Sequence, residues 1–491
     1  MRQRHVAHDA STDERRARMT RIPAQIVVLG GGFGGLYAAM TLQRELAGSD
    51  VAQVTLVDRR NYFTFTPFLP EVAAGTLGRV HVTYPLRFLA QKGRFCFVQG
   101  TVQDFNLAEQ TIRTETTTLT YDYLIVSLGG VPSFFGNSHI AAHALTLNSI
   151  DDALAIRNHA IRCFEHAVVE SDPIRRRQLL TFVVAGAGPC GVEVAAELRH
   201  LIRTVLLKYY PVDPSEIRIL LVSKGDRILP DFAGELAETG QKTLMKRGIE
   251  VRLHTRVTGA SMEHVELNDH ELIPTRTLIW AAGVTANPVL AKLPVPRSPQ
   301  GGIVVDEFLT IPACPEVYVI GDGASVVDRR QGRPYPALAP VAIRQGIRAA
   351  GNILNMLQGR IREPFRFDFT GNIVGLGCGM ALVNLLGLKF HGRLGWWFYR
   401  MAYLQRLVSF RNKASLTLTL ALNAIFGRDI SCETWPEADQ RALSGRVSAG
   451  APGFGRAGHR VSTASVPAVC PLCRARVDVQ GRFAALPAAS D

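Results

Sequence analysis

The chain has 491 residues, of which 47% are hydrophobic and 20% are charged, and its 55 Lys and Arg exceed its 42 Asp and Glu to give a formal net charge of +13. This length allows two or three domains with buried cores, and this composition excludes a largely disordered protein. The basic excess favours an anionic partner, and nucleic acid, anionic lipid and nucleotide phosphates are the candidates.

Residues 1–24 form a polar tail that lacks the apolar core of a signal peptide. We expect this tail to be disordered. Residues 26–58 then predict a strand (IVVLG), a glycine-rich turn, a helix (LYAAMTLQREL) and a second strand (VAQVTLVD), which together form a βαβ unit. Asp58 ends the second strand, where an acid commonly binds the ribose of an adenosine.

The glycines of this unit predict a cradle for a dinucleotide. In such a cradle one glycine allows a tight turn, a second lets backbone N–H groups approach a pyrophosphate, and a third allows the helix to pack on the strand. These are Gly30, Gly32 and Gly35, and we place Gly34, Arg59 and Gly129 at the same site.

Residues 181–223 repeat the whole unit, as TFVVAGAGPCGVEVAAEL followed by IRILLVS, with Gly186, Gly188 and Gly191 in the glycine positions. Two cradles imply two dinucleotides, and a flavin paired with a nicotinamide makes chemical sense because a flavin accepts a hydride and can release its electrons to a second substrate. At the end of the second strand, Ser223 and Lys224 stand where an NAD site commonly has an acid that repels a 2′-phosphate. We therefore expect NADPH to be accepted alongside NADH, although Lys224 could equally be a solvated turn residue.

Two further apolar strands end in small residues. LIWAAGV carries Ala282 and Gly283, which we assign to the nucleotide sites. EVYVIGDGAS ends in Asp322, which could accept a hydrogen bond from the ribityl chain of a flavin. The alternative for Asp322 is an ordinary turn after a strand.

Together, IVVLGGGFGGLYAA, NYFTFTPFLPEVAAGTL, FVVAGAGPCGVEVAAEL, LIWAAGV and VYVIGDGAS resemble the type II NADH:quinone oxidoreductases, the single-chain respiratory NADH dehydrogenases that do not pump protons. The resemblance spans roughly Ile26 to Pro436. It implies an α/β fold with two Rossmann-like dinucleotide-binding domains of the glutathione-reductase type, bound FAD in the first cradle, NADH in the second and a quinone reached from the membrane side. The expected division is an FAD-binding domain over 25–150 and 301–370, an NAD(P)H-binding domain over 151–300, a membrane-associating region over 371–436 and a disordered tail over 437–491.

The resemblance also places Glu193 near the flavin and the quinone, where it would help to position the nicotinamide or deliver a proton. Physically, a carboxylate just inside a helix N-terminus has its charge stabilised by the helix dipole; the alternative is a helix acid with no further role. Glu197, one turn on, is expected to be exposed or a packing partner. Pro340 stands where many relatives have glutamine and cannot bind a quinone carbonyl, which leaves Arg344 and Gln345 as candidates on the quinone side.

The third region has no Asp or Glu from Phe369 to Arg428, while basic, aromatic and leucine residues alternate there. This pattern is typical of an interfacial anchor, and we expect a peripheral protein on the cytoplasmic face of the inner membrane. The alternative is a packed helix pair with a solvated basic face. No nucleic-acid-binding motif accompanies the basic residues, a homodimer remains open, and Ile373 to Leu388 is expected to be a buried hairpin and not a membrane span.

Rival functions depend mainly on cysteines. A sulfide:quinone oxidoreductase needs a redox pair beside the flavin, for which Cys163 and Cys378 are the candidates, and a dithiol reductase is disfavoured because no CxxxxC follows the first cradle. A flavoprotein that senses NADH without turnover is a rival of another class. Cys470 and Cys473 form a CxxC without a second pair at metal-ligand spacing, so we expect no metal.

Overall fold

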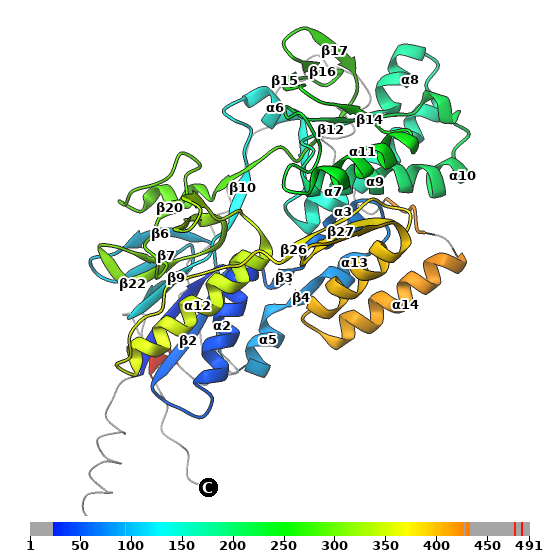
Figure 1. Cartoon of the computed structure of the whole chain (residues 1–491). Coiled ribbons are helices and arrows are strands. Elements are labelled where there is room, and N and C mark those ends of the chain that lie inside the picture. Colours follow the sequence, from blue (N-terminus) through cyan, green and yellow to red (C-terminus); the bar gives the residue numbers. More distant parts are fainter. Residues whose placement is uncertain (1–22, 94, 427, 433–475, 478–482, 485–491) are drawn as a thin grey trace, which may run out of the picture.

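The computed structural model describes residues 23–93, 95–426, 428–432, 476–477 and 483–484. They form two α/β lobes and a C-terminal layer that lies along one side of both (Figure 1). Of the tail expected over residues 1–24, only residues 23 and 24 are described. Cys470 and Cys473 lie outside the described residues. Within the tail expected over 437–491, Arg476–Val477 (β29) and Phe483–Ala484 (β30) pair as antiparallel strands.

The first lobe is built on a six-stranded sheet with the order β21-β22-β9-β1-β2-β5. Its central strands are parallel and nearly continuous apolar runs, because helices cover both faces of such a sheet. Two long helices, α2 and α12, pack closely together on one side (Figure 1). The elements are β1 (Ala24–Leu29), α2 (Phe33–Glu45), β2 (Ala52–Asp58), β5 (Cys96–Gln99), β9 (Tyr123–Val126), β21 (Thr310–Ile311), β22 (Cys314–Val319) and α12 (Ala339–Leu357).

Shorter elements complete this lobe. They are β3 (Tyr62–Thr64), α3 (Leu69–Ala73), α4 (Arg79–Val82), β4 (Thr83–Pro85), α5 (Leu86–Gly93), β6 (Val102–Asn106), β7 (Thr111–Thr114), β8 (Thr118–Thr120) and β10 (Gly130–Pro132).

The second lobe is a five-stranded parallel sheet with the order β11-β18-β12-β13-β14. Its elements are β11 (Ala144–Thr146), α7 (Ile150–Val169), α8 (Pro173–Leu180), β12 (Thr181–Ala185), α9 (Pro189–Leu201), a π-helical turn (Ile202–Leu206), α10 (Leu207–Tyr209), β13 (Arg218–Val222), α11 (Gly234–Lys246), β14 (Glu250–Arg252), the meander β15 to β17 (Val257–Ala260, His264–Leu267, Glu271–Pro274) and β18 (Thr277–Trp280).

Two short strands lie near the expected domain boundaries of this lobe. β11, just before residue 151, pairs with β18 of the second sheet. β19 (Val284–Ala286) pairs with β10 (Gly130–Pro132), which follows β9 of the first sheet. Both β11 and β19 are only three residues long, so the sequence carries little signal for them.

The C-terminal layer consists of an antiparallel sheet followed by two helices: β26 (Gly371–Gly375), β27 (Ala381–Leu385), β28 (Leu388–His391), α13 (Gly392–Arg406) and α14 (Phe410–Phe426). The antiparallel pairing expected over 373–388 is thus confirmed, but only its middle is buried, because Leu386 is 77% and Leu388 is 68% exposed. Across the described helices, none is long and apolar enough to cross a membrane.

This layer is tied to both lobes. Asn412 of α14 donates to the carbonyls of His81 and Thr83, both at 3.1 Å, in the first lobe. Arg247, beside α11, donates to the carbonyl of Gly377 at 3.0 Å. Beyond α14, the buried Arg157 of α7 holds the chain through the carbonyls of Asp429 at 2.8 Å and Ser431 at 2.9 Å.

Candidate functional site

The turn between β1 and α2 is built as a phosphate-binding turn. Gly30 has a φ of +97°, and a Cβ on Gly35 would clash with the carbonyl oxygen of Gly30, so strand and helix approach as closely as only glycine permits. Gly32 is the N-cap of α2, and a Cβ built there would meet no protein atom within 4 Å. The first N–H groups of α2 therefore face open space, which is what a pyrophosphate needs.

Asp58 stabilises this turn from the end of β2. Its Oδ2 accepts a hydrogen bond from the N–H of Gly31 at 2.6 Å, and its Oδ1 accepts one from the N–H of Arg60 at 2.7 Å. Burial raises the pKa of the Asp58 carboxyl. Each oxygen keeps a second lone pair for a ribose hydroxyl, whereas the neighbouring Arg59 side chain is exposed.

Gly34 has a packing role that the sequence did not separate from cofactor binding. A Cβ on Gly34 would lie 2.7 Å from Oγ of Ser127 and 3.3 Å from the carbonyl oxygen of Ala342, and one on Gly346 would clash with the carbonyl of Gly34. Gly34 thus allows α2 and α12 to touch. Gly129, at the end of β9, has a φ of +66° and an open side like Gly32.

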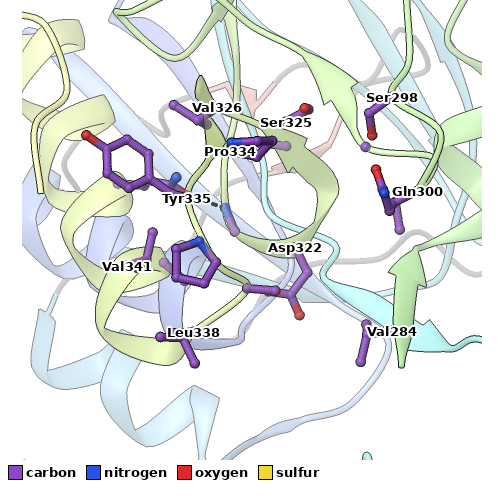
Figure 2. Close-up of a pocket in the computed structure, with 18 of the residues that line it drawn as sticks. Val284, Ser298, Gln300, Asp322, Ser325, Val326, Pro334, Tyr335, Leu338 and Val341 are labelled. Atoms are coloured by element: carbon purple, nitrogen blue, oxygen red, sulfur yellow. Dashed lines mark hydrogen bonds between the residues drawn. The ribbon is translucent and has the colours of Figure 1, made fainter. Parts of the chain in front are cut away.

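A cavity of about 250 Å³ lies in the first lobe, between β19, the 3₁₀ turn Gly321–Gly323 and the start of α12. Figure 2 shows Asp322 pointing into it between Leu338 and Val284. Burial raises the pKa of the Asp322 carboxyl, and no hydrogen bond to it is found among the described residues. A half-buried carboxylate without a protein partner fits the hydroxyl groups of a ribityl chain, so the first cradle and this cavity together fit FAD.

The second cradle repeats the geometry of the first. Gly186 has a φ of +103°, and a Cβ on Gly191 would clash with the carbonyl oxygen of Gly186. Gly188 is the N-cap of α9 and has open space in place of a Cβ. The backbone of Ala282 closes one side of this turn, 2.8 Å from the Cβ position of Gly186, and the carbonyl of Gly283 accepts from the N–H of Ser133 at 3.0 Å.

The end of β13 carries no acid toward the second cradle. Oγ of Ser223 accepts the N–H of Gly225 at 3.2 Å, and Lys224 is exposed with its Nζ 6.0 Å from the ring centre of Phe135. A hydroxyl and an ammonium group therefore follow β13, where the sequence predicts the adenosine ribose of NADH.

Glu193 is the fifth residue of α9 and lies beyond its first turn. Its side chain is 8% exposed, and its Oε1 accepts the N–H of Gly375 at 2.8 Å. Burial first, and then the charges of Glu71 and Glu197, raise the pKa of Glu193 to about 8. Burial thus disfavours the charged form of Glu193, in the direction opposite to the stabilisation expected from the helix dipole.

Three residues around Glu193 were not predicted from the sequence. Glu71 of α3 is 2% exposed; its Oε2 accepts from Nη2 of Arg400 at 2.7 Å and its Oε1 from the hydroxyl of Tyr399 at 3.3 Å. The signal was present, since Glu71 is the one acid in NYFTFTPFLPEVAAGTL, and a buried acid needs a partner. Its partners lie in the region that the sequence assigned only to membrane contact.

An aromatic cluster joins the first cradle to α13. Phe33, at the start of α2, lies 5.1 Å from Phe63 between ring centres, Phe65 lies 5.9 Å from Tyr403, and Tyr403 lies 4.7 Å from Tyr399. The aromatic residues of the NYFTFTPFL segment thus pack between the start of α2 and α13.

The three residues assigned to the quinone side are divided between two places. Pro340, the second residue of α12, and Arg344 line an open cavity of about 950 Å³ that Arg406 of α13 also reaches. Gln345 is buried on the opposite side, where its Oε1 accepts the N–H of Gly321 at 2.7 Å beside Asp322. Gln345 therefore orders the Asp322 turn.

Cys163 and Cys378, the candidates for a redox pair, are not bonded to each other. Cys163 is buried with its Sγ 3.4 Å from Nε2 of His159, and Cys378 is exposed with its Sγ 3.0 Å from Nδ1 of His200. No cluster of metal-ligating side chains is found in the described part of the chain.

Known oxidoreductases are similar to this chain over most of its length. The profile of the family described as pyridine nucleotide-disulphide oxidoreductase matches residues 24–346. The type II NADH:quinone oxidoreductase Ndh of Mycobacterium tuberculosis is 32% identical over 412 residues, which cover 80% of this chain and 87% of that protein. A protein of the same description from Staphylococcus saprophyticus is 27% identical over 390 residues, which cover 79% of this chain and 94% of that protein.

Solved structures show the same fold at lower identity. The structure of NDH2 from Plasmodium falciparum in complex with NADH matches with a TM-score of 0.77 and 21% identity, over 84% of this chain and 100% of that chain. The sulfide:quinone oxidoreductase of Aquifex aeolicus matches with a TM-score of 0.65 and 16% identity, over 84% of this chain and 99% of that chain. Both similarities concern the fold.

Proposed function

The chain belongs to the pyridine nucleotide-disulphide oxidoreductase family, and within it to the type II NADH:quinone oxidoreductases, and on this basis we propose that it oxidises NADH and reduces a quinone with FAD as its bound cofactor. The observation that carries this function is the repetition of one phosphate-binding turn in two lobes, each with open space over its N-cap glycine. FAD, when bound, accepts a hydride and passes two electrons to a second acceptor.

The residues around the first turn would hold FAD, with its pyrophosphate at Gly32, its ribose at Asp58 and its ribityl chain at Asp322. NADH would occupy the turn around Gly188. Glu193 lies where α9 of the NADH lobe meets the C-terminal layer, and a pKa of about 8 keeps its carboxyl group protonated at neutral pH. It can therefore donate a proton while a quinone is reduced, which is the role we assign to it.

We further propose that α13 and α14 place the protein on a membrane surface from which it takes quinone. Large apolar side chains on these helices are exposed, among them Trp397 at 62%, Phe410 at 84% and Ile425 at 73%. Arg393, Arg406 and Arg411 are exposed on the same helices, and no acid is interspersed. A basic and apolar surface suits the headgroup region of an anionic lipid bilayer. We propose that the protein binds the cytoplasmic face of the cell membrane. A second copy of the chain is the alternative partner for these helices.

Anaerobic mixing tests the function directly. NADH should bleach the flavin absorbance of the purified holoenzyme, and a subsequent addition of a short-chain quinone should restore it. Reduced flavin that persists in the presence of quinone would contradict a quinone reductase and favour an NADH sensor. Bleaching by sulfide would favour a sulfide oxidoreductase.

A further inference from the structure

The overall reaction consumes one proton. NADH and one proton reduce a quinone to a quinol and leave NAD⁺, so each turnover takes one H⁺ from solvent in addition to the hydride. If Glu193 donates this proton, it must be reprotonated from water. Its 8% exposure and its bond to the N–H of Gly375 leave little direct access.

A second cavity lies one turn along the same helix. It has a volume of about 320 Å³, opens to solvent and is lined by α9 and α10, the turn between β26 and β27, α13, α14 and Arg428. Glu197 and His200 line it, and Glu193, Glu197 and His200 have the spacing i, i+4 and i+7 that puts side chains on one face of a helix. The helix thus leads from the cavity to Glu193.

Glu197 is suited to exchange protons with water at neutral pH. Burial first, and then the charge of Glu71, raise the pKa of Glu197 to about 7, while Arg428 and Arg400 oppose the rise. The hydroxyl of Thr76 donates to its Oε2 at 3.3 Å. A carboxyl group with a pKa near 7 at the wall of a cavity that opens to solvent is suited to exchange protons at neutral pH.

The groups that surround Glu197 do not replace it as a proton carrier. Burial, followed by the charges of Arg428 and Arg247, lowers the pKa of His200 to about 4, so this imidazole stays neutral and its Nδ1 is engaged by Cys378. Glu71 is fixed by Arg400. The titratable or charged groups facing the path from the packed elements are Glu71 of α3, His200 of α9, Lys208 of α10, Arg247 beside α11, Cys378 of the hairpin, Tyr399, Arg400 and Tyr403 of α13, and Arg428 after α14.

Arg400 carries hydrogen-bond donors at the wall of this cavity, which it lines together with Glu197. Its Nη2 binds Glu71, while its Nε and Nη1 are buried without an acceptor among the described residues. The charge of Arg400 also opposes the raised pKa of Glu197. Donors without a protein acceptor beside Glu197 can orient water there.

We propose that Glu197 relays protons from this cavity to Glu193. In each turnover the Glu197 carboxyl group gives its proton to the deprotonated Glu193, and cavity water reprotonates Glu197; no electron moves in this step. The inference rests on the proposed function, since it concerns the proton that quinone reduction consumes. It assigns to Glu197 a role in relaying protons and none in binding either dinucleotide.

The test separates electron transfer from proton supply. Glu197→Gln keeps size and polarity but cannot carry a proton. In stopped-flow experiments its flavin should be reduced by NADH at the wild-type rate, and it should still reduce ferricyanide, which takes electrons without protons. Reoxidation by a short-chain quinone should slow at least ~10-fold, with a larger solvent isotope effect. Glu238→Gln, an exposed acid paired with Lys242 on the same lobe, is the matched control and should behave as wild type.

Two further measurements separate a relay from a structural role. Infrared titration of the oxidised protein without substrates should show a buried carboxyl group that protonates near pH 7 and is absent from Glu197→Gln. Formate should restore quinone reduction to Glu197→Ala, because a small acid fits the cavity.

Equal quinone rates in wild type and Glu197→Gln would overturn the relay, and so would equal slowing with ferricyanide and quinone. A wild-type protein that does not reduce quinone at all would instead overturn the proposed function.

Discussion

Glu193 and its neighbours show how burial selects the chemistry of a carboxyl group. At neutral pH the acid form predominates, because desolvation outweighs the single N–H bond from Gly375. Glu193→Gln should keep FAD bound, because this residue belongs to the other lobe, and should slow quinone turnover by ~10²-fold or more. Flavin absorbance and steady-state kinetics measure both. Full activity with unchanged substrate dependence would remove Glu193 from the mechanism.

The same raised pKa has a thermodynamic consequence. A pKa of about 8 in the folded protein exceeds the ordinary glutamate value of about 4.3, so the folded state binds more protons between these pH values. The contribution to stability is complete below the ordinary value and is lost as pH rises toward 8. Glu193→Gln removes this dependence. Its melting temperature should therefore rise relative to wild type between pH 5.5 and pH 9, by calorimetry of the holoenzymes, and a relative fall would show that Glu193 is charged in the fold.

We predict that Ser223 and Lys224 decide which nicotinamide is accepted. Without an acid directly after β13, no carboxylate would repel a 2′-phosphate there, and the exposed Lys224 would attract one. We expect measurable NADPH oxidation alongside NADH, and Ser223→Glu should restore a strong preference for NADH. Catalytic efficiencies for both nucleotides test this. Discrimination against NADPH by more than ~10³, about 4 kcal/mol in transition-state binding, would contradict it.

The two glycine turns are elements that can be disabled separately. The backbone of Gly32 (φ −77°) and of Gly188 (φ −71°) is extended, and a Cβ at either would meet no protein atom within 4 Å, so valine is compatible with folding but occupies the phosphate space. Gly32→Val should yield folded protein without flavin. Gly188→Val should keep its flavin, which dithionite still reduces but NADH does not. Circular dichroism confirms folding, and loss of flavin from both variants would contradict the assignment of one dinucleotide to each turn.

Helices α13 and α14 are the proposed membrane contact and α13 also binds Glu71, so deleting them cannot test membrane contact alone. A truncation before Phe390 would also remove Tyr399 and Arg400 and leave Glu71 without partners. Replacing exposed side chains is cleaner: Trp397→Ser, Phe410→Ser and Ile425→Ser together should abolish co-sedimentation with vesicles of anionic lipid while FAD remains bound. Ile361→Ser is the control, because Ile361 follows α12, outside these two helices, and is 89% exposed. Retained binding would place the contact elsewhere, and light scattering would reveal a dimer if a second copy covers this face.

At the scale of the whole molecule, sequence and structure agree where a feature is local. Both dinucleotide turns could be predicted because strand, glycines and helix follow one another within about 20 residues. The cluster of Glu71, Glu193 and Arg400 could not be predicted, because Glu71 and Arg400 are separated by 329 positions. Neither segment carries a sequence pattern that indicates contact with the other. The position of Gln345 beside Asp322 depends on the rotation of α12, which a sequence leaves open. The raised pKa of Glu193 depends in turn on the layer that buries it.

The fastening of the C-terminal layer limits how this molecule can move. Domains linked by a flexible connection usually hinge about it. Here one continuous segment is bound to α11 by Arg247, to the first lobe by Asn412 and again to α7 by Arg157. Opening the lobes would break contacts at the middle of the segment and at its end. We therefore expect the segment to brace the two lobes and to keep the distance between the two nucleotide turns nearly constant while a nicotinamide binds and leaves.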